Sequence, residues 1–213
     1  MSYKLIVEKL RITREKHNII TRDILVKDYC KPLKMSYASI IGYLLSNKYL
    51  ARIFRGIFYI YSTDERKFGK LETNFYNILK DALEIRGIKN WYFGLKSGLK
   101  LNNLTHEYFT REFIISDKIK LKNPLTIMGR EIVFKNIKTK LTRFGIIKEP
   151  YPYSDTEKTI LDLVYFAIYG NLGESGAKNA IIDYVDKCNK TKLREYAKHY
   201  PKTAIKLIES IKS

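Results

Sequence analysis

The most constraining feature of this chain is one segment, residues 19–61, which reads IITRDILVKDYCKPLKMSYASIIGYLLSNKYLARIFRGIFYIY. Two helical patterns come first, and two short apolar β runs follow, over residues 50–54 and 57–61. Arg55-Gly56 separates the β runs, and a glycine there can adopt the positive φ that a tight hairpin turn needs. A further amphipathic helix is expected over residues 3–15. Three helices followed by a hairpin predict a winged helix-turn-helix.

Local signals set the expected limits of the two helices. Thr21 can accept a hydrogen bond from an early backbone N–H, so a helix is expected over residues 22–29. Pro32 is expected to stop it, because proline lacks the N–H that a helix interior requires. Ser36 is the expected N-cap of the next helix, over residues 37–47.

The second helix has one apolar side and one side of small or polar residues. At about 100° per residue, the side expected to pack inward carries Tyr37, Ile40, Ile41, Leu44 and Leu45. The opposite side carries Ser39, Gly42, Tyr43 and Ser46. In a helix-turn-helix the exposed side of this helix enters the major groove of DNA. Short hydroxyl side chains and a glycine suit that role, since they allow close approach to base edges and phosphates.

Double-stranded DNA is therefore the expected partner. The residues expected to contact it are Lys34, Ser36, Ser39, Tyr43, Ser46, Lys48, Arg52 and Arg55. The lysines flank the helix and the arginines belong to the hairpin, positions that suit phosphate contacts. Residues 1–62 hold twelve basic side chains against four acidic ones. The alternative is a small helical domain whose charged rim is only solvated.

The formal charge of the 213 residues is +18, an imbalance that favours a polyanionic partner. An anionic membrane is the other candidate, but no apolar run approaches the roughly 20 residues that span a bilayer. The first sixteen residues, MSYKLIVEKLRITREK, lack the long apolar core of a signal peptide. A cytoplasmic protein without a membrane partner is expected.

The remainder of the chain predicts a second, α+β domain. Residues 62–69 are polar and are expected to form a linker between a domain at 1–62 and a domain at 70–213. Expected elements include an amphipathic helix over 73–87, a buried strand over 91–93, a short helix over 95–103 and a helical tail. Ser154 and Glu157 fit a capping box at the start of another helix.

Between these helices lies a stretch that predicts a small basic sheet. Residues 111–148 carry ten basic side chains against three acidic ones, and strands are expected at EFIIS, KIKLK, EIVFK and RFGII. A strand at KIKLK would place its three lysines on one face. The expected second basic surface comprises Lys118, Lys120, Lys122, Lys135, Lys138 and Lys140. A solvated sheet face, a nucleic-acid surface and a surface for an acidic protein all remain open.

Catalytic signals are weak. Common phosphate-binding, nucleophile and zinc motifs are missing from the sequence. His106-Glu107 is more simply a pair of loop residues, and Cys30 and Cys188 form no C-x-x-C pattern. We therefore expect no catalytic residues, no metal site and no cofactor. A nucleic-acid-processing enzyme that docks through the winged helix is the remaining catalytic alternative.

Three stretches, in order, are similar to one known family. They are the helix-turn-helix segment with TRDILVKDYC and RIFRGIFYI, the segment WYFGLKSGLKLNNLTHE, and the segment YSDTEKTILDLVYFA. Together they resemble the AbiEi antitoxins, the repressor half of type IV toxin–antitoxin systems. The resemblance covers most of the chain. Lys100, in a segment that is usually more apolar, and a short final helical tail depart from the family pattern.

The resemblance implies a particular function. The winged helix would bind inverted repeats in the operator and repress its own operon. The second domain would counter a nucleotidyltransferase-like toxin without a stable complex. The resemblance carries over no catalytic residues, and it implies DNA contact for Ser36, Ser39, Tyr43, Arg52 and Arg55. The alternative is a winged-helix regulator whose second domain binds an effector or partner, without a toxin.

Overall fold

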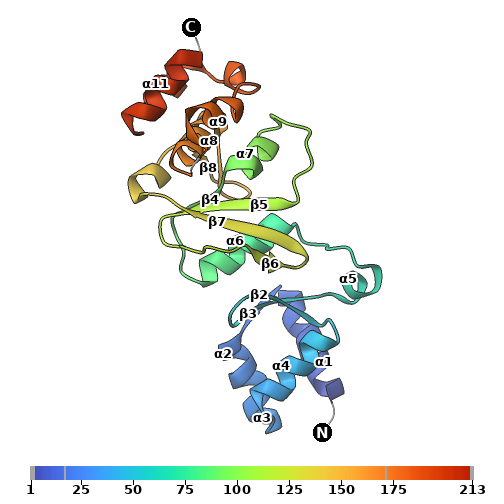
Figure 1. Cartoon of the computed structure of the whole chain (residues 1–213). Helices are drawn as coiled ribbons and strands as arrows, with labels where there is room; N and C mark the ends of the chain where they lie inside the picture. Colours follow the sequence, from blue (N-terminus) through green and yellow to red (C-terminus); the bar gives the residue numbers. More distant parts are fainter. Residues whose placement is uncertain (1–2, 17, 171, 212–213) are drawn as a thin grey trace. The chain divides into compact units, whose positions relative to one another are not determined.

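The computed structural model describes residues 3–16, 18–170 and 172–211. It has an α+β fold: N-terminal helices with a small three-stranded antiparallel sheet, then a six-stranded mixed sheet and C-terminal helices. The chain divides into two compact units (Figure 1). Unit 1 extends to Ile88 and includes Ile127–Gly129, and unit 2 comprises Lys89–Thr126 and the chain from Arg130. The expected domain limits, 1–62 and 70–213, stay a prediction.

Unit 1 begins with helix α1 (Tyr3–Lys16), as expected. The next helix is longer than predicted: α2 (Arg22–Ile24), a π-helical stretch (Leu25–Cys30) and α3 (Lys31–Leu33) follow one another without a break. The expectation that Pro32 stops the helix after Tyr29 is therefore wrong. Pro32 lies at one of the first two positions of α3, where the missing N–H costs least. The helix ends instead at Lys34, which adopts a left-handed conformation with φ 51°.

Helix α4 (Tyr37–Ser46) confirms the predicted second helix and its cap, because the Ser36 side chain accepts a hydrogen bond from the Ser39 N–H at 3.1 Å. The hairpin follows as β2 (Leu50–Phe54) and β3 (Ile57–Ile60). Gly56 turns between them with φ 77°. A strand that was not predicted, β1 (Ile19–Thr21), pairs antiparallel with β3 and completes the sheet in the order β1-β3-β2.

One hydrophobic core joins these helices to the hairpin. α1 and α4 both supply side chains to it, as do the π-helical stretch and both long strands. Its buried members are Ile6, Leu10, Ile20, Leu25, Tyr29, Cys30, Ile40, Ile41, Leu44, Leu50, Phe58 and Ile60. The inward side of α4 predicted from the helical wheel is thus the side that packs.

The segment predicted to be a linker is folded. Residues 63–68 form helix α5 (Thr63–Phe68), which opens with a complete capping box between Ser62 and Glu65. Helix α6 (Phe75–Ile85) follows and contacts β1 and β2. The polar composition of residues 62–69 was misleading, because Glu65 points inward and is only 3% exposed.

Unit 2 contains most of the mixed sheet. Its strands are β4 (Trp91–Phe93), β5 (Arg111–Ser116), β6 (Leu125–Ile127), β7 (Arg130–Asn136), β8 (Ile146–Ile147) and β9 (Tyr153–Ser154). They lie in the order β6-β7-β5-β4-β9-β8. β4 is antiparallel to β5, whereas β5 is parallel to β7.

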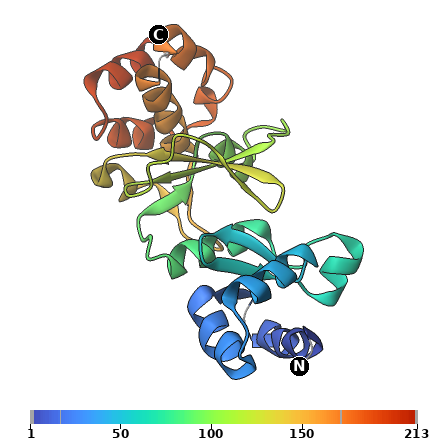
Figure 2. The ribbon, with the colours of Figure 1, turned by 60° about the horizontal axis from the view of Figure 1, so that its bottom comes forward.

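The helices of unit 2 are α7 (Leu95–Leu101), α8 (Thr156–Tyr169), α9 (Gly173–Asn179), α10 (Lys190–Ala197) and α11 (Lys202–Ile211). Short 3₁₀ turns cover Thr139–Thr142 and Val185–Lys187. Figure 2 shows the orange and red helices of this unit gathered on one side of its sheet. α8 lies at the centre of the core, where Ile160, Leu161 and Val164 are fully buried.

Two predictions for this unit are wrong. KIKLK is a loop rather than a strand, although Ile119 is buried and the lysines on either side of it are exposed. Helix α8 is capped by Asp155, whose side chain accepts from the Lys158 N–H, and not by Ser154. Ser154 is instead buried in β9, with its hydroxyl 2.7 Å from that of Thr159.

Candidate nucleic-acid interface

Helix α4 exposes a narrow face of small side chains. Ala38, Ser39, Gly42 and Ser46 are exposed, whereas Ile40 and Leu44 on the other side are fully buried. Apart from Gly42 itself, its two chain neighbours and the adjacent backbone of its own helix, no described heavy atom lies within 4 Å of the position that a Cβ would occupy there. A glycine that no neighbour requires leaves this face open to close approach by another molecule.

Tyr43 is not oriented as predicted. Its ring stacks on that of Tyr3, with centroids 4.0 Å apart, and lies 5.9 Å from the ring of Tyr49. Desolvation by this packing, with the neighbouring Tyr49, raises the pKa of the Tyr43 hydroxyl. The expectation that Tyr43 lies opposite the packed side is therefore wrong, while its contact with DNA stays a prediction.

The serines on and before α4 already make internal hydrogen bonds. The Ser36 and Ser39 hydroxyls are 2.8 Å apart, and the Ser46 hydroxyl donates to the Tyr43 carbonyl at 3.1 Å. Because a hydroxyl has one donor and two acceptor sites, Ser46 can still accept a hydrogen bond from a base amino group. Lys34 and Lys48 are exposed on either side of α4, both with left-handed backbone.

An arginine-lined hollow of about 290 Å³ lies beside the start of α4. Its lining comprises Arg22, Tyr37, Arg52, Arg55, Gly56 and Phe58. The Arg22 backbone N–H donates to the Gly56 carbonyl at 2.8 Å, so the first residue of α2 holds the hairpin tip. The Arg22 guanidinium lies over the Tyr37 ring, 5.2 Å from its centroid, a cation–π arrangement.

Arg22 was not among the residues predicted to contact DNA, because its contacts with Gly56 and Tyr37 join segments that are separated in the sequence. A second hollow, of about 410 Å³, is lined by Arg22, Asp23, Val26, Lys27 and Lys31. A helical wheel would not have grouped Arg22 with Lys31, because nine residues at about 100° each place them on opposite sides of an α-helix. The basic side chains near α4 therefore include Arg22, Lys27 and Lys31 in addition to the residues predicted to contact DNA.

In unit 2, the six lysines predicted to form the second basic surface are all exposed. They belong to different local structures rather than to one strand face. Lys118, Lys120 and Lys122 lie in the loop after β5, and Lys135 lies on β7. Lys138 and Lys140 lie at the 3₁₀ turn that follows. Their role as a binding surface stays a prediction.

The segments WYFGLKSGLKLNNLTHE and YSDTEKTILDLVYFA, which contain α7 and α8, pack against each other in unit 2. Gly98 of α7 allows close contact with α8, since a Cβ there would lie 2.6 Å from the Thr159 hydroxyl oxygen. Asn102 closes the same corner, because its amide donates to the carbonyls of Gly98 and Ser154, both at 2.8 Å. Gly98 and Asn102 therefore have a structural role in holding α7 against the start of α8.

A buried ionic network in α8 was also missed. The side chains of Lys158 and Asp162 are both 0% exposed and form an ion pair at 2.8 Å. Tyr92 and Tyr200 donate to the same carboxylate at 2.7 and 2.6 Å. Desolvation lowers the Lys158 pKa, and Asp162 opposes that effect. The i, i+4 spacing was the only signal in the sequence.

The described residues contain no group of three or more His, Cys, Asp or Glu side chains that could hold a metal ion. His106 lies in the loop after α7 and is exposed. None of the helices in the described part of the chain has the length and apolar character that crossing a bilayer requires.

Comparison with known proteins gives a fold-level likeness. No protein-family model matches the chain, and no curated protein matches it. Among solved structures, it is similar to the crystal structure of the Rv2827c protein from Mycobacterium tuberculosis, with a TM-score of 0.62. The alignment covers 98% of this chain and 75% of the mycobacterial chain, at 13% sequence identity. At an identity that low, the structural likeness shows a shared α+β fold alone.

Proposed function

We propose that unit 1 is a winged helix-turn-helix domain that binds double-stranded DNA. In this proposal, the exposed face of α4 enters the major groove, and the β2–β3 hairpin contacts the sugar–phosphate backbone as the wing. The observation that carries the proposal is the open face around Gly42, together with the hollow lined by Arg22, Arg52 and Arg55 at the start of the same helix. Small side chains permit entry into the groove, and guanidinium groups bind phosphate well.

The order of elements supports the same proposal. The α1 helix, the α2–α3 helix and α4 share one core with the hairpin, and Arg22 fixes the hairpin tip through the Gly56 carbonyl. A hairpin held in this way keeps its arginines near the N-terminal end of α4. A backbone that is already fixed in this way loses less conformational freedom on binding than a mobile hairpin does.

We further propose that the protein is an antitoxin that represses its own operon and counters a nucleotidyltransferase-like toxin. This finer proposal rests on the resemblance of three sequence stretches to AbiEi antitoxins. We propose a binding role rather than a catalytic one, in the cytoplasm and without a cofactor.

Two experiments test these proposals separately. Fluorescence anisotropy with a duplex from upstream of the protein's own gene tests DNA binding. We expect specific binding, with a nonspecific duplex binding at least about 1000-fold more weakly. Co-expression with the nucleotidyltransferase encoded beside the gene tests the antitoxin role: growth should be rescued by wild-type protein. Failure of rescue with operator binding intact would leave a regulator without antitoxin activity.

A further inference from the structure

Unit 1 contains a second basic cavity, located at the opposite end of α4 from the arginine-lined hollow. It measures about 240 Å³ and is bounded by α1, the turn after α4, the end of β3 and the start of α5. Three arginines line it: Arg11 and Arg14 from α1, and Arg66 from α5. Glu15 is the one acidic residue among the lining residues. The DNA-binding proposal makes no use of this cavity.

Two of these guanidinium groups are incompletely satisfied. The Nε atoms of Arg14 and Arg66 are buried, yet neither has a hydrogen-bond partner among the described residues. Buried donors are nearly always paired with protein, water or a ligand, so each unpaired donor requires an explanation. Both residues line the same cavity, and an acceptor bound inside it would lie close to both side chains.

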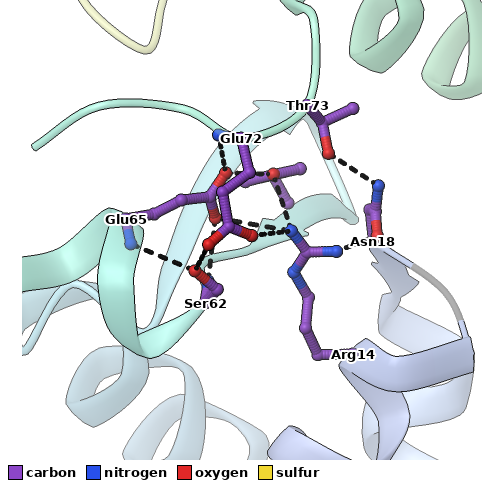
Figure 3. Close-up of polar contacts among 7 residues, drawn as sticks. Arg14, Asn18, Ser62, Glu65, Glu72 and Thr73 are labelled. Carbon is purple, nitrogen blue, oxygen red and sulfur yellow. Dashed lines mark hydrogen bonds and ion pairs between the residues drawn. The ribbon is translucent and has the colours of Figure 1, made fainter.

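The remaining contacts fix both arginines in place. The Arg66 guanidinium lies on the Tyr49 ring, 3.6 Å from its centroid, and donates to the Asn47 carbonyl at 3.2 Å. Figure 3 shows Arg14 directed toward Glu65 and Glu72, at 3.6 and 3.5 Å. Arg14 is therefore partly neutralised, whereas Arg66 makes a cation–π contact and a hydrogen bond to a backbone carbonyl. Arg66 and the exposed Arg11 thus provide most of the positive charge that is available to a ligand.

The floor of the cavity is apolar. Val7, Leu10 and Ile60 line it, and all three are buried. Tyr49 and Tyr61 add aromatic surface. A DNA backbone needs charge and access but no apolar floor. An apolar floor beneath a few convergent polar groups is instead typical of a small-molecule site.

From this combination we infer that the cavity binds a small organic anion, a phosphate or carboxylate attached to a compact apolar group. The anionic group is held by Arg66 and Arg11, and the apolar group lies against Leu10 and Ile60. At about 240 Å³ the cavity is smaller than most drug-sized sites. It suits a ligand with a single ring. Tyr49 also lies beside Tyr43 of α4, so an occupant would touch a residue that packs on that helix.

Phenyl phosphate is the probe that tests the inference, with benzyl alcohol as its uncharged counterpart and inorganic phosphate as the anion alone. Isothermal titration of the full chain should show saturable binding of phenyl phosphate. Benzyl alcohol and inorganic phosphate should each bind at least about tenfold more weakly, because each lacks one of the two interactions. Equal binding of inorganic phosphate would show a plain anion site and overturn the inference.

Variants locate the site. Arg66→Gln and Arg11→Gln should each weaken phenyl phosphate binding about tenfold or more. Arg55→Gln, which removes a charge from the other hollow, should leave it unchanged. Loss of binding in Arg55→Gln alone would assign the probe to the proposed DNA face, and no binding by wild-type protein would reject the site. DNA affinity is measured separately, so failure here leaves the proposed function standing.

Discussion

The Tyr59 hydroxyl donates a hydrogen bond of 2.6 Å to the Glu65 carboxylate, and it thereby joins β3 to α5. The same carboxylate accepts the backbone N–H groups of Ser62 and Glu72, at 2.8 and 2.9 Å. Glu65 thus connects the hairpin to the segment that follows it. This segment belongs to unit 1 for a physical reason, because a buried carboxylate needs several donors.

Glu65 makes unit 1 sensitive to acid. Burial raises the pKa of Glu65, but the hydrogen bonds from Tyr59, Ser62 and Glu72, together with Arg14, outweigh that effect and hold it below its ordinary value of 4.5. A carboxyl group whose pKa is lowered by folding stabilises the folded state fully above about pH 4.5. That stabilisation is lost as the pH falls through the pKa of the group in the folded state. In urea denaturation, the free energy of unfolding should fall less between pH 7 and pH 3.5 in Glu65→Gln than in wild type. Equal losses would contradict this role for Glu65.

Gly98→Ala should destabilise unit 2. The added Cβ would lie 2.6 Å from the Thr159 hydroxyl oxygen and 2.8 Å from that of Ser154, so α7 must shift. Overpacking of this kind costs about 1–3 kcal/mol in the free energy of unfolding. Lys96→Ala, an exposed change in the same helix, is the matched control and should cost less than about 1 kcal/mol. Similar midpoints in thermal unfolding for both variants would refute close packing at Gly98.

Lys158→Met should lower the free energy of unfolding more than a double substitution that removes both charges of the ion pair. Removing the buried lysine leaves Asp162 as an uncompensated buried carboxylate, a loss of about 3–5 kcal/mol. The double variant with Asp162→Asn removes that charge, and its amide oxygen can still accept from Tyr92 or Tyr200. Its stability in chemical denaturation should therefore exceed that of Lys158→Met. If the two changes simply add, the ion pair is not coupled as described.

Gly42→Ala should separate stability from DNA binding. Alanine is favoured over glycine in a helix by about 1 kcal/mol, and no described atom from outside the local backbone of α4 lies within 4 Å of the added methyl group. The melting temperature should rise slightly, while affinity for operator DNA falls because the methyl group projects from the exposed face of α4. A variant that binds the operator as well as wild type would remove this face from the interface.

Much of unit 1 could be predicted from the sequence, because its signals are local. The Ser36 cap, the apolar side of α4 and the Arg55-Gly56 turn each depend on residues close together in the chain. β1 could not be predicted, since its three residues form a strand only by pairing with β3. The orientation of Tyr43 depends on Tyr3 and Tyr49, which a helical wheel does not contain.

The second unit was less predictable, because the structure of its segments depends more on which other segments they pack against. Alternating KIKLK has the pattern of a strand, but no partner strand pairs with it in the described sheet, and it remains a loop. At the start of α8, two residues compete for the cap, and burial of Ser154 against Thr159 leaves Asp155 to cap the helix. In the candidate interface, Arg22 escaped prediction because its role depends on the Gly56 carbonyl, 34 positions away.

The salt dependence of duplex binding tests the central claim most directly. The logarithm of the affinity of the full chain for upstream duplex DNA is measured against the logarithm of salt concentration, for wild type, Arg55→Ala and Lys70→Ala. Each phosphate contact contributes about one unit of slope. Arg55→Ala should therefore weaken binding and flatten the slope by up to about one unit, while exposed Lys70, outside the α4–hairpin face, should change neither. An unchanged slope in Arg55→Ala, or no duplex binding by wild-type protein, would contradict the account.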